Sequence, residues 1–126
     1  KVSKFLSKQK KIIKVFYPYK KGSQNYKLWK KYYSGATGLL SIVIKSKKKS
    51  SVMKFVNSLE LFGIGYSWGG FESLAILQDL KKQTEYTKGR HFFRFNNDEH
   101  IVRLHIGLED PKDLISDLKT SLRYIK

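Results

Sequence analysis

The sequence contains no cysteine, only two prolines and no long uninterrupted apolar run. The absence of cysteine excludes a disulfide framework, thiolate chemistry and cysteine-ligated metal sites. No apolar segment approaches the roughly 20 residues that a membrane-spanning helix requires. The first residues also lack the apolar core of a signal peptide. With 126 residues, the chain has the length of one domain with a single modest core.

Acidic residues are absent from the first 59 positions, which carry sixteen lysines. From Glu60 to Lys126, ten basic and ten acidic residues balance. A lysine-rich half with interleaved tyrosine and tryptophan is typical of a nucleic-acid-binding module. Lysine outnumbers arginine 22 to 4, however, and bidentate reading of bases and phosphates is mainly performed by arginine. Codon bias in an AT-rich genome predicts the same composition, and salt-dependent retention on DNA would count against that explanation.

Hydrophobic periodicity predicts strands that alternate with helices. The expected elements are a helix tail at 2–9, a strand at 12–18, a helix at 23–33, a strand at 38–45, a helix at 50–62, a short helix at 74–83, a strand at 100–107 and a helix at 110–125. This order predicts a small α+β domain with an antiparallel or mixed sheet and helices packed on one face.

Several single residues suggest where the helices begin and end. Ser23 can cap the second helix, and Gly63 can end the third. Asp110 is the expected N-cap of the last helix, with Pro111 in its first turn. One stripe at i, i+4 spacing in the second helix is expected to pack in the core; its members are Leu28, Trp29, Tyr32 and Tyr33.

The most distinctive stretch is GIGYSWGGFES at 63–73, which holds four glycines within eight positions. Glycine permits a positive φ and a close approach of the backbone. The stretch therefore predicts a tight loop that presents Ser67 and Trp68. A glycine-rich turn with a tryptophan in the core is the structural alternative.

GYSWG at 65–69 also matches the nucleophile-elbow pattern G-x-S-x-G of serine hydrolases. The remaining triad positions could be filled by Asp79 or Glu85 and then by His100 or His105. The preceding segment is an expected helix rather than a buried strand, so a serine hydrolase is the weaker hypothesis. The spacing of the three histidines fits no metal-ligand pattern, so no metal site is expected.

Arg103 lies in the middle of the otherwise apolar strand at 100–107. A guanidinium is costly to desolvate there unless it meets an anion. Glu72 or Glu109 could be such a partner within the chain. The functional alternative is a bidentate clamp on a substrate carboxylate.

Two stretches, YSWGGFESL at 66–74 and IVRLHIGLEDPKDLISDL at 101–118, resemble the C-terminal region of the pyridoxal-phosphate-dependent Cys/Met metabolism enzymes. YSGATGLLSIVIK at 33–45 and FVNSLELFGIGYS at 55–67 support the likeness. The similarity covers nearly the whole chain but is weak at 76–99. Within the family, the sequence most resembles the cystathionine beta-lyase branch.

The resemblance implies a fold type I enzyme of which residues 1–126 form the small C-terminal domain. The lysine that binds pyridoxal 5'-phosphate as a Schiff base would lie in a large domain that precedes it. The chain alone is therefore expected to hold no cofactor and to be inactive. The complete enzyme is expected to be a cytoplasmic homotetramer that takes an amino-acid thioether. By β-elimination it would convert cystathionine to homocysteine, pyruvate and ammonia in methionine biosynthesis.

By the same resemblance, Arg103 matches the clamp on the substrate carboxylate, and Tyr66, Ser67 and Trp68 match the loop that lines the pocket. No catalytic residue and no cofactor ligand are expected within this chain. The strand pattern indicates Arg103 independently, whereas the roles of the loop residues follow from the resemblance alone.

Overall fold

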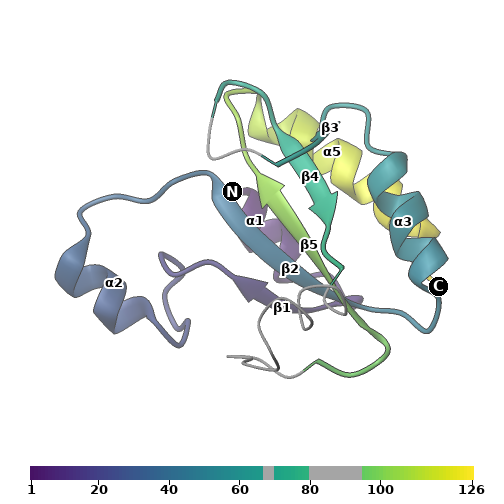
Figure 1. Cartoon of the computed structure of the whole chain (residues 1–126). Helices are drawn as coiled ribbons and strands as arrows, with labels where there is room; N and C mark the ends of the chain where they lie inside the picture. Colours follow the sequence, from purple (N-terminus) through teal and green to yellow (C-terminus); the bar gives the residue numbers. More distant parts are fainter. Residues whose placement is uncertain (67–69, 80–94) are drawn as a thin grey trace.

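The computed structural model describes residues 1–66, 70–79 and 95–126. Within these residues, five strands form one mixed sheet in the order β1-β2-β5-β4-β3 (Figure 1). The strands are β1 (Ile12–Phe16), β2 (Leu39–Lys45), β3 (Gly63–Ile64), β4 (Leu74–Leu77) and β5 (Glu99–His105). The helices are α1 (Val2–Leu6), α2 (Tyr26–Tyr32), α3 (Lys49–Asn57), α5 (Pro111–Ser121) and the short 3-10 helix η1 (Leu122–Tyr124).

The described strands pair antiparallel except for β3 and β4, which are parallel, so the predicted α+β class is confirmed. In these ranges, no helix has the length and apolar character needed to cross a bilayer.

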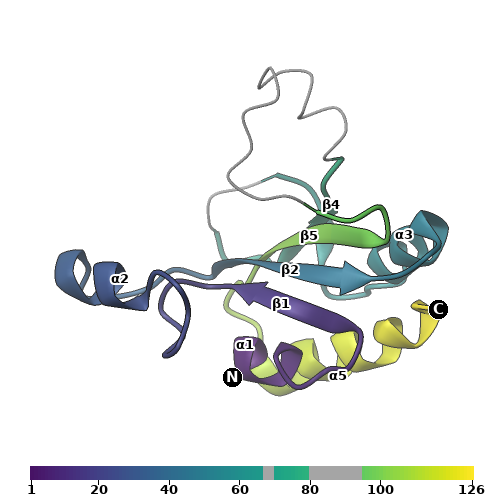
Figure 2. The same ribbon diagram turned by 90° about the horizontal axis from the view of Figure 1, so that it is seen from below.

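The hydrophobic core lies between the sheet and three of the helices. Figure 2 shows α1 and α5 on one side of the sheet. The strand residues that alternate toward these helices are buried; they include Leu40, Ile42, Ile44, Val102 and Leu104. The helical members of the core are Val2, Leu6, Val52, Phe55, Val56, Leu114, Leu118 and Leu122. The prediction of helices packed on one face is therefore correct for α1, α3 and α5.

The start of α5 is fixed by side-chain capping, as predicted. Asp110 is the N-cap, and its carboxylate accepts a hydrogen bond from the backbone N–H of Lys112 at 2.7 Å. Pro111 begins the helix and lacks an N–H that would otherwise need a partner. Asp113 adds a negative charge to the first turn, where the helix dipole favours it. This cap directly follows the turn after β5, so it also fixes how the end of β5 leaves the sheet.

Two of the predicted boundaries near the glycine-rich stretch are wrong. Residues 74–77 form β4 rather than a helix. A four-residue apolar run fits either structure, and the pairing of β4 with both β3 and β5 decides for the strand. Gly63 begins β3 instead of ending the preceding helix, which ends at Asn57 with Ser58 as its C-cap.

The predicted core stripe of α2 is also wrong. The helix lies away from the sheet (Figure 1), and none of its residues is buried. Leu28 is 58% exposed and Tyr32 is 66% exposed. Trp29 packs edge-on against Tyr19 and stacks on Tyr26, outside the core. The periodicity of α2 therefore reflects a surface-exposed aromatic cluster.

Ser23 does not cap α2. Asn25 occupies the N-cap position without a side-chain bond, and the Ser23 hydroxyl donates to the carbonyl of Pro18 at 3.0 Å. The hydroxyl thus closes the turn after β1 instead of accepting from the first N–H groups of α2.

Candidate functional site

Arg103 lies in the middle of β5, the central strand of the sheet. Its neighbours Val102 and Leu104 are fully buried in the core. Strand alternation therefore directs Arg103 to the opposite face, away from α1 and α5. Ser41 of β2 and Ile76 of β4 are its register partners on that face. The side chain is half-buried, so its guanidinium is held at the sheet surface by the flanking strands.

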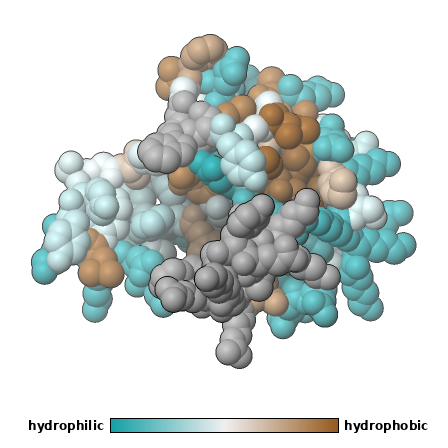
Figure 3. Space-filling view, in the orientation of Figure 1, coloured by the Kyte–Doolittle hydropathy of each residue, from teal (hydrophilic) through white to brown (hydrophobic). Residues whose placement is uncertain are grey.

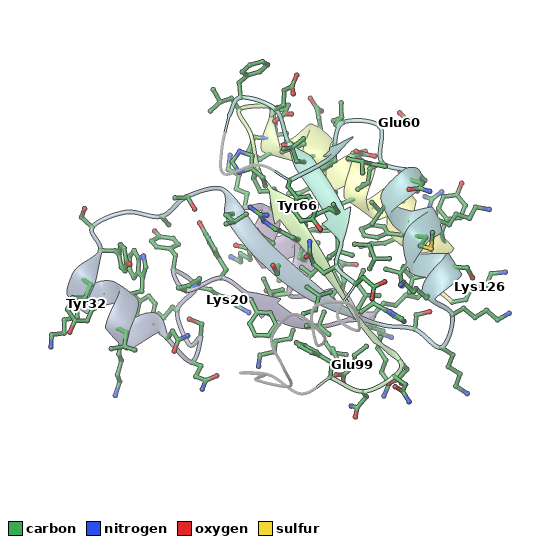
Figure 4. The ribbon with its side chains drawn as sticks, in the orientation of Figure 1. Lys20, Tyr32, Glu60, Tyr66, Glu99 and Lys126 are labelled. Atoms are coloured by element: carbon green, nitrogen blue, oxygen red, sulfur yellow. The ribbon has the colours of Figure 1, made fainter. Side chains whose placement is uncertain are left out.

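Tyr66 lies close to Arg103. The guanidinium carbon of Arg103 is 6.0 Å from the centroid of the Tyr66 ring, at the outer range of a cation–π contact. Figure 4 shows Tyr66 beside the sheet near β4 and β5. Tyr66 is 68% exposed, and its ring borders the guanidinium. The structure thus brings one residue of each predicted motif together, while Ser67 and Trp68 lie outside the described residues.

The backbone before Tyr66 is anchored on β4. The N–H of Gly63 donates to the carbonyl of Ser73 at 2.9 Å, and the N–H of Gly65 donates to that of Ala75 at 3.4 Å. Gly63 also packs closely on β4, because a β-carbon there would lie 3.1 Å from Leu74. The position of Tyr66 therefore depends on the position of Ser73 and on where β4 begins.

Ser73 and Glu109 form a clamp between the glycine-rich stretch and the turn after β5. One carboxylate oxygen of Glu109 accepts from the backbone N–H of Ser73 at 2.7 Å, and the other accepts from its hydroxyl at 2.8 Å. Ser73 is fully buried. A buried N–H and hydroxyl require partners, and the carboxylate supplies both acceptors. We call this pair the Ser73–Glu109 clamp.

Further backbone bonds close the same junction. The N–H of Gly107 donates to the Ser73 hydroxyl at 2.9 Å, and the N–H of Leu108 donates to the carbonyl of Phe71 at 2.9 Å. A β-carbon at Gly107 would collide with the Phe71 carbonyl and the Glu109 carboxylate. Glycine is therefore required there so that the two backbones can approach.

His105 adds one more contact to this junction. Its ring is only 6% exposed, and its Nε2 lies 3.3 Å from the carbonyl oxygen of Gly70. Because a carbonyl can only accept, this contact requires the proton on Nε2. Nδ1 has no hydrogen-bond partner within the described residues. The structure thus uses His105 to hold Gly70 to the end of β5.

The electrostatics of the clamp favour an ionised Glu109. Burial by itself would raise the pKa of the Glu109 carboxyl. The hydrogen bonds from the Ser73 backbone and hydroxyl, the N–H of Glu109 itself and the nearby His105 outweigh burial and hold that pKa below its ordinary range. Each oxygen of Glu109 accepts one bond from Ser73, so the charge of this carboxylate serves the clamp.

The geometry argues against the serine-hydrolase hypothesis. A nucleophile elbow joins a buried strand to a helix. Here the stretch follows β3, a two-residue exposed strand, and leads into the strand β4. Of the triad candidates, Asp79 lies 3.3 Å from the ammonium of Lys49, and the His100 ring bonds to the Ser46 carbonyl. Glu85 lies outside the described residues. The nucleophile-elbow interpretation of GYSWG is therefore wrong.

Within the described residues, no group of side chains is arranged to bind a metal ion or a lysine-bound cofactor. They contain no cluster of three metal-binding side chains. Their lysines are exposed except for Lys20, which is half-buried. A cavity of about 350 Å³ lies beside β1 and the segment that follows it, and neither Arg103 nor Tyr66 lines it.

Sequence analysis did not assign a positioning role to Ser73, Gly107 or Glu109. Glu109 was considered only as a partner for Arg103. The available signal was that all three residues lie within the two motifs. Pairing of two distant segments cannot be read from either segment alone.

The family model of Cys/Met metabolism PLP-dependent enzymes matches residues 1–123. Similar proteins include a cystathionine beta-lyase of Bordetella avium, 38% identical over 96% of the chain, and that of Escherichia coli K12, 35% identical over 94%. An L-alanine/L-glutamate racemase of Wolbachia pipientis wMel is 37% identical over 96% of the chain. The chain spans 29% of the length of each of these relatives.

Among solved structures, the fold is similar to a crystal structure described as an O-acetylhomoserine (thiol)-lyase of Campylobacter jejuni. The TM-score is 0.72 and the sequence identity is 28%. The match covers 97% of this chain and 26% of that one.

Proposed function

Because the chain belongs to the Cys/Met metabolism PLP-dependent enzyme family, we propose that it is the substrate-carboxylate-binding, C-terminal part of a carbon–sulfur lyase. The proposed reaction is the β-elimination of cystathionine to homocysteine, pyruvate and ammonia, a step that supplies methionine biosynthesis. The support is the identity of 33–38% to proteins named cystathionine beta-lyase over nearly the whole chain.

The observation that carries the proposal is the position of Arg103. Its guanidinium stands on the central strand, on the face opposite α1 and α5, and beside the exposed ring of Tyr66. A guanidinium presents paired N–H donors that match both oxygens of a carboxylate. The α-carboxylate of an amino-acid substrate therefore fits this position.

The role of Arg103 in the reaction would be orientation. A two-point contact fixes the carboxylate in both position and rotation, which also fixes the bonds around the attached α-carbon. Holding a reacting group in one geometry can lower a barrier by several kcal/mol. We propose that Tyr66, Ser67 and Trp68 border the same pocket. For Ser67 and Trp68 this rests on the resemblance alone.

The described residues do not fit the cofactor itself. Pyridoxal phosphate is held by a lysine in an enclosed site, and the lysines described here are exposed or half-buried. We therefore propose that a separate large domain of the same enzyme binds the cofactor and that the chain alone is inactive. A mixture of the chain with pyridoxal phosphate and cystathionine should then release no pyruvate.

We further propose that the face carrying Arg103 docks against that large domain in a cytoplasmic homotetramer. Figure 3 shows hydrophobic side chains at the top of this face, where the turn before β4 and the turn after β5 meet. Phe71 and Leu108, from these two turns, are 71% and 84% exposed. Exposed apolar groups at the rim of a binding face are typical of a domain interface.

Amino-acid racemisation is the second candidate function. The relative from Wolbachia pipientis is named a racemase for L-alanine and L-glutamate and is about as similar as the lyases. Both reactions require the substrate carboxylate to be held, so Arg103 fits either.

The deciding experiment uses the complete enzyme that contains this chain, purified with its cofactor. Pyruvate release is measured with cystathionine, and D-alanine formation is measured with L-alanine. Pyruvate as the dominant product supports the lyase. D-alanine formation without pyruvate release would replace the lyase by a racemase.

A further inference from the structure

Ser73 is the point where three segments of the chain are joined. Its N–H and hydroxyl donate to Glu109, and its carbonyl accepts from Gly63. Gly63 begins the segment that carries Tyr66 to the side of Arg103. A continuous path of hydrogen bonds therefore leads from Glu109 to the residues beside the guanidinium.

We propose that Glu109 is a positioning residue for the substrate-carboxylate site. It acts through Ser73, which sets the start of β4 and the anchoring of β3, and so sets where Tyr66 stands relative to Arg103. The proposal rests on the proposed function in one respect, namely that Arg103 binds a carboxylate.

The chemistry of the clamp explains why a carboxylate is needed at position 109. Ser73 offers two donors toward it, and its hydroxyl already accepts from Gly107. A glutamine could accept one of these bonds through its oxygen, but its amide nitrogen would face the second donor. Glu109→Gln therefore keeps the size of the side chain and removes one of the two bonds.

His105 supports the same arrangement from the other side of the junction. Its Nε2 contact fixes Gly70, and it lies two residues along β5 from Arg103. The bond of Leu108 to Phe71 lies between the His105 contact and the clamp. Residues 105–109 thus hold the segment 70–73 at three residues, Gly70, Phe71 and Ser73. Within these two segments, Glu109 is the side chain that accepts from two donors.

The first experiment measures the clamp without relying on activity. Amide hydrogen exchange is followed by mass spectrometry in the complete enzyme and in its Glu109→Gln variant. Exchange should become faster in peptides covering 63–66 and 70–77 and should stay unchanged in α3. Unchanged exchange in both peptides would overturn the proposal.

The second experiment separates positioning from general support of the fold. Binding of L-alanine is titrated through the visible absorbance of the bound cofactor, which gives Kd even when no turnover occurs. Because the substitution disturbs the position of Tyr66 beside Arg103, Glu109→Gln should raise this Kd by about two- to fivefold, the loss expected for an exposed cation–π contact. The matched control is Glu60→Gln, which neutralises an exposed glutamate with no side-chain bond to this junction and should leave Kd unchanged.

A double-mutant cycle with Arg103→Lys then decides the mechanism. If Glu109 acts by placing Tyr66 beside the guanidinium, its substitution should leave Kd nearly unchanged once the guanidinium is absent. The same factor in both backgrounds would mean that Glu109 only supports the fold, and would overturn the proposal. Ser73→Ala, which keeps the N–H bond and removes the hydroxyl, serves as the second variant if Glu109→Gln does not fold.

These results are distinguishable from failure of the proposed function. The cycle reports on carboxylate binding and is independent of whether cystathionine is cleaved or alanine is racemised. An enzyme that releases no pyruvate but shows coupling between positions 109 and 103 would contradict the lyase assignment. The same result would still support the positioning role of Glu109.

Discussion

The guanidinium carbon of Arg103 lies 6.0 Å from the ring centroid of Tyr66, although the two residues belong to motifs that are well separated along the chain. The contact exists because β3 and β5 both pair with β4, so the segment after β3 returns to the sheet beside the middle of β5. An aromatic face next to a guanidinium restricts how the guanidinium can turn.

Replacing Arg103 tests the carboxylate clamp in the complete enzyme. Arg103→Ala should lower kcat/KM for cystathionine by at least about 100-fold, because hydrogen bonds to a charged group are each worth about 1.5–3 kcal/mol. Arg103→Lys should retain part of the rate, since it keeps the charge and loses the paired geometry. Steady-state pyruvate release checks both variants. A near-normal kcat/KM for Arg103→Ala would rule out the clamp.

Replacing Tyr66 tests its contact with Arg103. Tyr66→Ala should weaken substrate binding by about two- to fivefold, because an exposed cation–π contact is worth about 0.5–1 kcal/mol. Tyr66→Phe keeps the ring and should bind nearly as well as the wild type. The measurement is KM for cystathionine in the two variants. Equal losses in both would show that the hydroxyl matters and not the ring.

The pH dependence of stability tests the clamp between Glu109 and Ser73. The pKa of Glu109 is lower in the folded chain than its ordinary value of 4.5, because the Ser73 bonds outweigh burial. The clamp therefore contributes stability at pH values above that ordinary value, and loses it as the pH falls through the folded pKa.

The wild type should accordingly be more stable than Glu109→Gln at pH 7, and the difference should shrink on acidification. The check is the thermal unfolding midpoint of both proteins measured from pH 7 down to about pH 3, below the ordinary carboxyl range. A difference that stays constant over this range would exclude an ionised Glu109 in the clamp.

A pair of identical substitutions tests where the core ends. Leu118→Ala removes a fully buried side chain of α5 and should lower the free energy of unfolding by about 2–5 kcal/mol. Leu28→Ala removes a side chain of α2 that is 58% exposed and should change it by no more than about 0.5 kcal/mol. Urea unfolding of the chain provides the comparison. Similar losses in the two variants would mean that α2 packs in the core after all.

Local sequence patterns correctly predicted the features that depend on neighbouring residues, namely strand burial and helix capping. The alternation in β2 and β5 placed Leu40, Ile42, Val102 and Leu104 in the core, and Arg103 on the other face. The Asp110 cap was predicted because capping depends on a few adjacent residues. Where a pattern fits two structures, prediction failed. The run LAIL became β4 because strands on both sides pair with it.

The sequence by itself determined the family likeness, the α+β class, the buried strand faces and the place of Arg103 on the opposite face of its strand, since each depends on residues close together in the chain. Only the tertiary structure decided that α2 is left outside the core, that Tyr66 stands beside Arg103, and that Glu109 engages Ser73. The physical reason is that these contacts join segments through strand pairing and turn geometry. The neighbours of a side chain in the sequence do not determine which distant donor or surface it will contact.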